Sequence, residues 1–75
     1  MDEQEVKAIV TVCQEMGVLA TGVRSRGAVL VIEPVMGAAL PGADVLRELS
    51  SKLAKLGHRY VTLDLGGYAA QGGEL

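Results

Sequence analysis

The segment Ala28-Val29-Leu30-Val31-Ile32 constrains the fold more than any other part of the chain. All five residues are apolar, so both alternating faces of a strand built from them would avoid water. This pattern is typical of a strand that is covered on both sides. Pro34 then ends the strand or marks its edge. We therefore expect a central strand here, with material packed against both of its faces.

A helix is predicted in front of this strand. Asp2 stands three residues before Glu5, which is the spacing of a capping box at a helix start. Gly17 is the expected left-handed residue after the helix. Apolar residues recur between these ends at the helical spacing, namely Val6, Ile9, Val10, Cys13 and Met16.

A second helix is predicted behind a loop rich in glycine and proline. It opens at Ala43-Asp44, and Gly57 ends it. Its apolar stripe is made of leucines, which are Leu46, Leu49, Leu53 and Leu56. Lysines, arginine and glutamate fall outside this stripe, so one face of the helix is expected to pack on the core.

Two further strands complete the prediction. Residues 18–24 are rich in β-branched and small side chains, and the turn Ser25-Arg26-Gly27 follows them. Residues 60–65 alternate strictly, with Val61, Leu63 and Leu65 on the core face. The order α-β-β-α-β predicts an α+β, two-layer domain with both helices on one face of a small mixed sheet. It resembles half of a ferredoxin-like fold without its first strand, so either the sheet rearranges or a neighbouring chain fills the gap.

The length of the chain limits it to one core. With 75 residues, we expect a single domain over residues 1–68 and a flexible, glycine-rich tail over residues 69–75. A core of this size is marginal, and Cys13 is the only cysteine, so no disulfide can reinforce it. A partner subunit is the remaining support, and we expect a homo-oligomer.

Charge and hydropathy argue against several classes of partner. The net charge is −2, and the seven lysines and arginines form no stripe, so we expect no binding to nucleic acid. No apolar run is long enough to cross a membrane, and the first residues are acidic where a signal peptide is basic. These features predict a cytoplasmic protein with no membrane partner.

The residues that could carry chemistry are few. Cys13 lies on the apolar stripe of the first helix and is expected to be an inert packed cysteine. His58 is the only histidine, and we expect it to interact with the free carbonyl groups and the dipole at the C-terminal end of the second helix. The sequence contains neither a Cys/His cluster for zinc nor a phosphate-binding loop before a helix. We predict no catalytic residue, no metal site and no cofactor.

The best polar cluster is the turn Arg24-Ser25-Arg26. Two guanidinium groups and a hydroxyl at one hairpin suit a phosphate or a carboxylate, although a solvated turn is the plainer interpretation. Asp64 is a carboxylate inside a strand and needs a cation or solvent. If the first and last strands pair, Arg24 is its candidate ion-pair partner.

The end of the chain resembles a known family. The segment from Leu56 to Tyr68, Leu-Gly-His-Arg-Tyr-Val-Thr-Leu-Asp-Leu-Gly-Gly-Tyr, is similar to the C-terminal signature of the LarE-type ATP-dependent sacrificial sulfur transferases, which belong to the PP-loop superfamily. Upstream, the end of the first helix, the turn at residues 23–27 and the strand after it keep that family's order. Arg24 matches one of the family's anion-binding arginines. Ala69 stands where the family has another arginine, and Gly66 stands where it has a glutamate.

The resemblance implies an accessory role. It includes neither the ATP-binding motif nor the sacrificed cysteine of that family, which both lie outside the C-terminal domain. The chain is thus expected to be a non-catalytic assembly module, self-associating or docking on a PP-loop sulfur transferase. The alternative is a protein that binds a small anion or a nucleotide phosphate in a sulfur or cofactor pathway.

Overall fold

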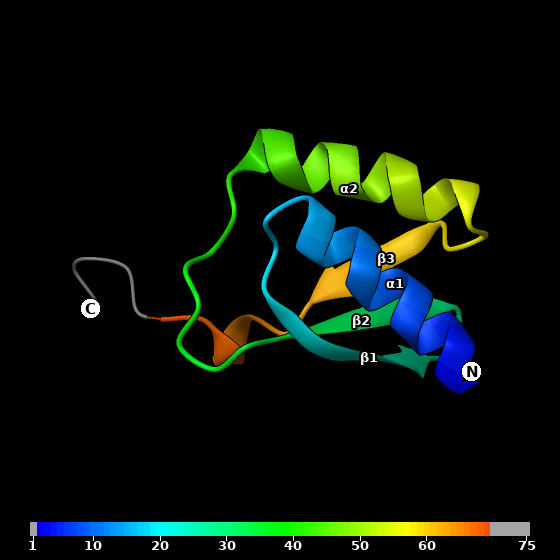
Figure 1. Ribbon diagram of the computed structural model, residues 1–75, viewed down its shortest axis with the longest axis horizontal. Helices are drawn as coiled ribbons and strands as arrows, with labels where there is room; N and C mark the ends of the chain where they lie inside the picture. The colour runs from blue at the N-terminus through cyan, green and yellow to red at the C-terminus, as the bar shows by residue number, and fades with distance from the viewer. Residues whose placement is uncertain (1, 70–75) are drawn as a thin grey trace.

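A computed structural model describes residues 2–69 of the chain (Figure 1). The predicted order of two helices and three strands is confirmed, and a short 3-10 helix follows the last strand. The elements are α1 (Glu3–Glu15), β1 (Ala20–Arg26), β2 (Val29–Pro34), α2 (Ala43–Lys55), β3 (Tyr60–Leu63) and η1 (Leu65–Gly67). The predicted tail falls outside the described residues except for Ala69, whose N–H donates to the carbonyl oxygen of Ala38 at 2.9 Å.

Both ends of α1 are built as the sequence predicts. The carboxylate of Asp2 accepts a hydrogen bond from the N–H of Glu5 at 2.8 Å, which satisfies one of the free donors of the first turn. Gly17 follows the helix with a φ of 79°, a conformation that residues with a Cβ adopt at a cost. Between these ends, Ile9 and Cys13 are fully buried and hold α1 on the sheet.

The hairpin of β1 and β2 turns later than predicted. β1 reaches Arg26, which pairs with Val29, so the turn consists of Gly27 and Ala28 alone. Gly27 has a φ of 62°, and a glycine with positive φ in the first central position fits the tight two-residue turns of β-hairpins. The strand therefore runs over 20–26 instead of 18–24, because the turn needs only the glycine and one further residue.

The sheet has the order β1-β2-β3, with β1 antiparallel and β3 parallel to the central β2. β2 and β3 pair directly, so the sheet rearranges and leaves no gap where a ferredoxin-like fold would hold another strand. β1 and β3 are not paired, because β2 lies between them. This order removes the condition for an ion pair between Arg24 and Asp64, and that prediction is wrong.

The helices cover only one face of the central strand. Leu30 and Ile32 are buried in the core with Leu49 and Leu53 of α2. Val29 and Val31 alternate with them and lie on the opposite face, on which no helix packs within residues 2–69; Val29 is exposed there, whereas Val31 is only 9% exposed. The prediction of cover on both faces thus holds for one face of the chain. We call the other one the uncovered face.

The last strand is shorter than predicted. β3 ends at Leu63, and Leu65 begins η1 and is 66% exposed, so the expected core position of Leu65 is wrong. The chain turns because the N–H of Gly67 donates to the carbonyl oxygen of Asp64 at 3.1 Å. Gly67 then packs against Pro34, where an added Cβ would lie 2.7 Å from Cγ of the proline ring. This contact holds the end of the described chain against β2.

Candidate functional site

The predicted anion-binding cluster is divided between the two faces of the sheet. Ser25 pairs with Leu30 in the core-facing row of the hairpin, whereas Arg24 pairs with Val31 on the uncovered face. Arg26 lies on the same side as Arg24, one alternation further along β1. The hydroxyl therefore cannot join the two guanidinium groups around one ligand. Anion binding by the two arginines stays a prediction.

Arg24 already has an intrachain partner. Its Nη1 lies 3.3 Å from Oε2 of Glu33 on the neighbouring strand. The two side chains are 51% and 36% exposed, so solvent screens this pair and it contributes little to stability. Glu33 nevertheless lowers the positive charge available to an anion. This ion pair follows from the order of the strands. The neighbour of β1 is β2, which carries Glu33, and not β3, which precedes Asp64.

Cys13 is the packed cysteine that the sequence predicts. It is fully buried, and burial raises the pKa of its thiol while a backbone hydrogen bond opposes the rise. The hydroxyl of Tyr68 lies buried nearby without a hydrogen-bond partner in the described chain. Burial, and secondly the nearby Cys13, raise the pKa of this phenol. Both groups are therefore neutral at physiological pH, and neither is an activated nucleophile.

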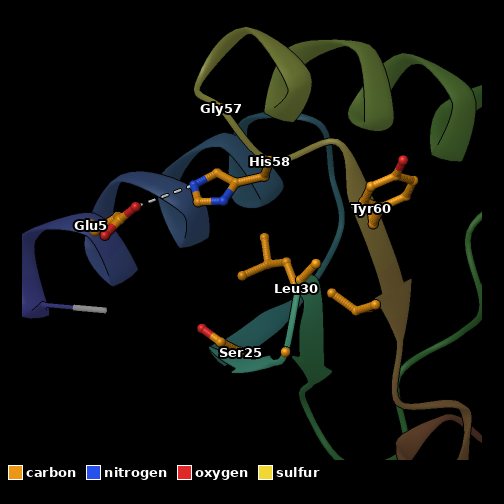
Figure 2. Close-up of a pocket in the computed structure, with 9 residues that line it drawn as sticks. Glu5, Ser25, Leu30, Gly57, His58 and Tyr60 are labelled. Atoms are coloured by element: carbon orange, nitrogen blue, oxygen red, sulfur yellow. Dashed lines mark ion pairs between the residues drawn. The ribbon is translucent and has the colours of Figure 1, made fainter.

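His58 differs from its prediction. Its backbone N–H caps α2 by donating to the carbonyl oxygen of Leu53 at 2.9 Å, but its imidazole turns away from the helix end. Nε2 lies 3.5 Å from Oε2 of Glu5 in the first turns of α1 (Figure 2). The sequence held no signal for this contact, since 53 positions separate the two residues and neither the capping box of Glu5 nor the segment around His58 points to the other.

A polar cavity of about 290 Å³ surrounds this histidine, with Ser25, the Gly27-Ala28 turn and Tyr60 on its other sides (Figure 2). Its ionisable groups are one imidazole and one carboxylate besides the phenol. No hydrogen bond joins Ser25 to His58 in the described part of the chain, and none of the described side chains gather in threes to hold a metal ion. This arrangement fastens α1 to the loop before β3.

A second hollow, which we call the α2–β3 groove, has a volume of about 250 Å³ and an apolar lining. It runs between α2 and the outer edge of β3. The lining residues are Leu46, Leu49, Ser50, Val61, Thr62, Leu63 and Leu65. None of them is charged. Sequence reasoning missed this groove, because it depends on where α2 lies relative to the sheet.

Comparisons with family models, curated proteins and solved structures found no match to this chain. Within residues 2–69, neither helix has the length and apolar character needed to cross a membrane.

Proposed function

We propose that the chain is a non-catalytic assembly module that associates with a second copy of itself through the uncovered face of its sheet. One observation carries this proposal, namely that the central strand places Val29 and Val31 on a face that no helix within residues 2–69 covers, where only the side chains of neighbouring strand residues bury Val31 to 9% exposure. Val29 is 37% exposed and its neighbour Tyr60 on β3 is 58% exposed. Monomers seldom leave a contiguous apolar sheet face in water.

A second apolar area lies at the other end of the hairpin, beyond the pair of Arg24 and Glu33. Leu19 and Val35 are 54% and 40% exposed, and the N–H of Val35 donates to the carbonyl oxygen of Leu19 at 3.1 Å. Their neighbours Val18, Ala20 and Pro34 are buried, so alternation directs both side chains to the uncovered face. Apolar residues therefore lie at both ends of this face.

Charge favours a second copy as the occupant. The middle of the face carries one cation, Arg24, and one anion, Glu33, 3.3 Å apart, and Arg26 adds a second cation beside Val29 at one end. Under a two-fold axis, such a pair meets its own complement, so each arginine can approach the partner's glutamate without repulsion. A typical interface takes about 10% of a small protein's surface. For an exposed area of 5013 Å², this is about 500 Å² per copy, near the lower limit of specific interfaces. We expect a weak dimer.

Light scattering coupled to gel filtration tests the proposal at tens of micromolar and above. We expect the wild type to run as a dimer and Val29→Glu to run as a folded monomer, because the new carboxylate lies in the interface. Ser51→Glu, on the exposed side of α2, is the matched control and should remain dimeric. A wild type that is monomeric at every concentration, or a dimeric Val29→Glu, would contradict self-association through this face.

Docking on a PP-loop sulfur transferase is the other form of this proposal. Its support is the resemblance of residues 56–68 to the C-terminal signature of those enzymes. In a titration of such an enzyme with this chain, binding should be lost with Val29→Glu and kept with Ser51→Glu. Calorimetry with ATP alone should give no heat of binding, since the chain has no phosphate-binding loop. Micromolar ATP binding would instead favour the nucleotide-binding alternative.

A further inference from the structure

The layer of helices is wider than the sheet beneath it. Packed helices are about 8–10 Å apart, so two of them cover about 16–20 Å. Three strands at about 4.8 Å span only about 14 Å. Because α1 packs on β1 and also contacts α2, α2 must extend past the last strand. Figure 1 agrees, since α2 lies beyond β3 on the side away from β2.

Burial along the two neighbouring strands shows the same mismatch. Leu30 and Ile32 on β2 are 4% and 0% exposed. Val61 and Leu63 pair with them on β3 and share their face, yet both are only partly buried. The apolar surface of α2 therefore extends beyond the buried core, past the edge of β3. The α2–β3 groove lies beside β3, where a fourth strand would find room beneath α2.

Within residues 2–69, β3 is the last strand of the sheet, and no strand pairs with its edge at this groove. The N–H of Asp64 donates to the carbonyl oxygen of Ile32 at 2.9 Å, so Asp64 and Thr62 direct their backbone groups towards β2. The alternate residues, Val61 and Leu63, direct theirs away from the sheet. β3 contains no charge and no proline, which are the usual protections of an exposed edge.

We propose that the α2–β3 groove accepts one extended segment of a partner protein, which pairs with β3 as a fourth strand beneath α2. The backbone of the segment would bond to Val61 and Leu63. Alternate side chains of the segment would enter the groove beside Leu46 and must be apolar, because the groove contains no charge to pair with a polar group.

Charges at the two ends of β3 set the direction and flanks of the segment. Arg59 precedes the strand and Asp64 follows it. The first residue of an antiparallel segment lies opposite Asp64 and its last residue lies opposite Arg59. A basic first residue and an acidic last residue would therefore face the opposite charge at both ends. We therefore assign the pattern base, apolar, polar, apolar, polar, acid to the occupant.

A second copy of the chain fits this groove poorly. Each copy has two helices and three strands. Pairing β3 with the sheet edge of another copy would therefore keep the same ratio of helices to strands, and the helix layer would still be wider than the sheet. A single extended segment brings no helix and makes four strands for two helices. The groove is separate from the uncovered face, so this proposal does not depend on self-association.

The test is an NMR titration of the isotopically labelled chain with the capped peptide Lys-Val-Thr-Val-Thr-Glu. We expect saturable shifts at Val61, Leu63 and Leu46, and slower hydrogen exchange at the amides of Val61 and Leu63. A peptide with proline in place of both valines should not bind, because it lacks the N–H groups that pair with β3. Ser50→Lys places a long cation in the groove and should weaken binding about tenfold or more. Ser51→Lys, one residue further on the exposed side, is the matched control and should bind normally.

Three results would overturn the proposal. One is the absence of shifts up to millimolar peptide, and another is shifts confined to the uncovered face. The third is concentration-dependent protection of Val61 and Leu63 without peptide, which would identify a second copy as the occupant. Loss of dimerisation in Val29→Glu leaves these readouts unchanged, so failure of one proposal is distinguishable from failure of the other.

Discussion

Replacing Ile32 by alanine should destabilise the chain far more than replacing Val29, although both lie on the same strand. Ile32 is fully buried between the sheet and the helices, whereas Val29 is 37% exposed on the uncovered face. Ile32→Ala removes three carbon atoms from the core, which costs about 2.4 kcal/mol in transfer free energy at about 0.8 kcal/mol per methylene. The cavity left behind raises the loss to about 3–4 kcal/mol. Val29→Ala should cost less than about 1 kcal/mol.

The size of this loss makes the measurement decisive. A chain of 75 residues has a free energy of unfolding of about 4–11 kcal/mol. Ile32→Ala would therefore remove a large part of it and lower Tm by about 12 °C or more. Urea unfolding followed by circular dichroism, with protein dilute enough to be monomeric, gives both free energies. Equal losses in the two variants would refute the assignment of the β2 faces, and with it the uncovered face.

Three further predictions concern single contacts. Gly67→Ala should lower the free energy of unfolding by about 1–3 kcal/mol, since its Cβ would lie 2.7 Å from the Pro34 ring; an unchanged urea midpoint would contradict this packing. Cys13 should react with a thiol reagent only as fast as the chain unfolds, because it is fully buried; immediate labelling of the native chain would exclude that burial. Arg24→Ala and Glu33→Ala should each change the stability of the monomer by less than about 1 kcal/mol, and a double-mutant cycle measures their coupling.

The elements of the fold could be predicted from local patterns. The capping residue Asp2 and the left-handed Gly17 and Gly57 mark helix ends, and these signals depend only on neighbours in sequence. The end of β3 was missed, because strict alternation continues to Leu65 while the chain turns where Gly67 packs on Pro34. That contact joins residues far apart in sequence, so periodicity cannot reveal it.

The candidate sites depended still more on tertiary structure. The cluster of Arg24, Ser25 and Arg26 is contiguous in sequence, but a strand directs consecutive side chains to opposite faces, and the turn assigned to these residues comes later. The contact of Glu5 with His58 and the α2–β3 groove arise from the placement of whole elements. Only the order of strands and the position of α2 reveal them.

The buried hydroxyl of Tyr68 leads to the last prediction, that Tyr68→Phe stabilises the chain. The hydroxyl is removed from water without a hydrogen-bond partner in the described chain, and such a group costs about 1–3 kcal/mol. Phenylalanine keeps the ring and removes that cost, so the free energy of unfolding should rise by about 1 kcal/mol.

The pH dependence gives this prediction a second readout. Burial raises the folded-state pKa of Tyr68 and of Cys13, so the unfolded chain releases these protons at a lower pH than the folded chain does. The native state then holds more protons, and stability is retained below the ordinary values of about 8.5 for the thiol and about 10 for the phenol and falls as the pH rises through them. Because Tyr68→Phe removes one of the two titrations, its urea midpoint should fall less between pH 8 and pH 11 than that of the wild type. A variant that is less stable than the wild type at pH 7 and equally sensitive to alkali would show that the hydroxyl has a partner, contrary to the packing described for it.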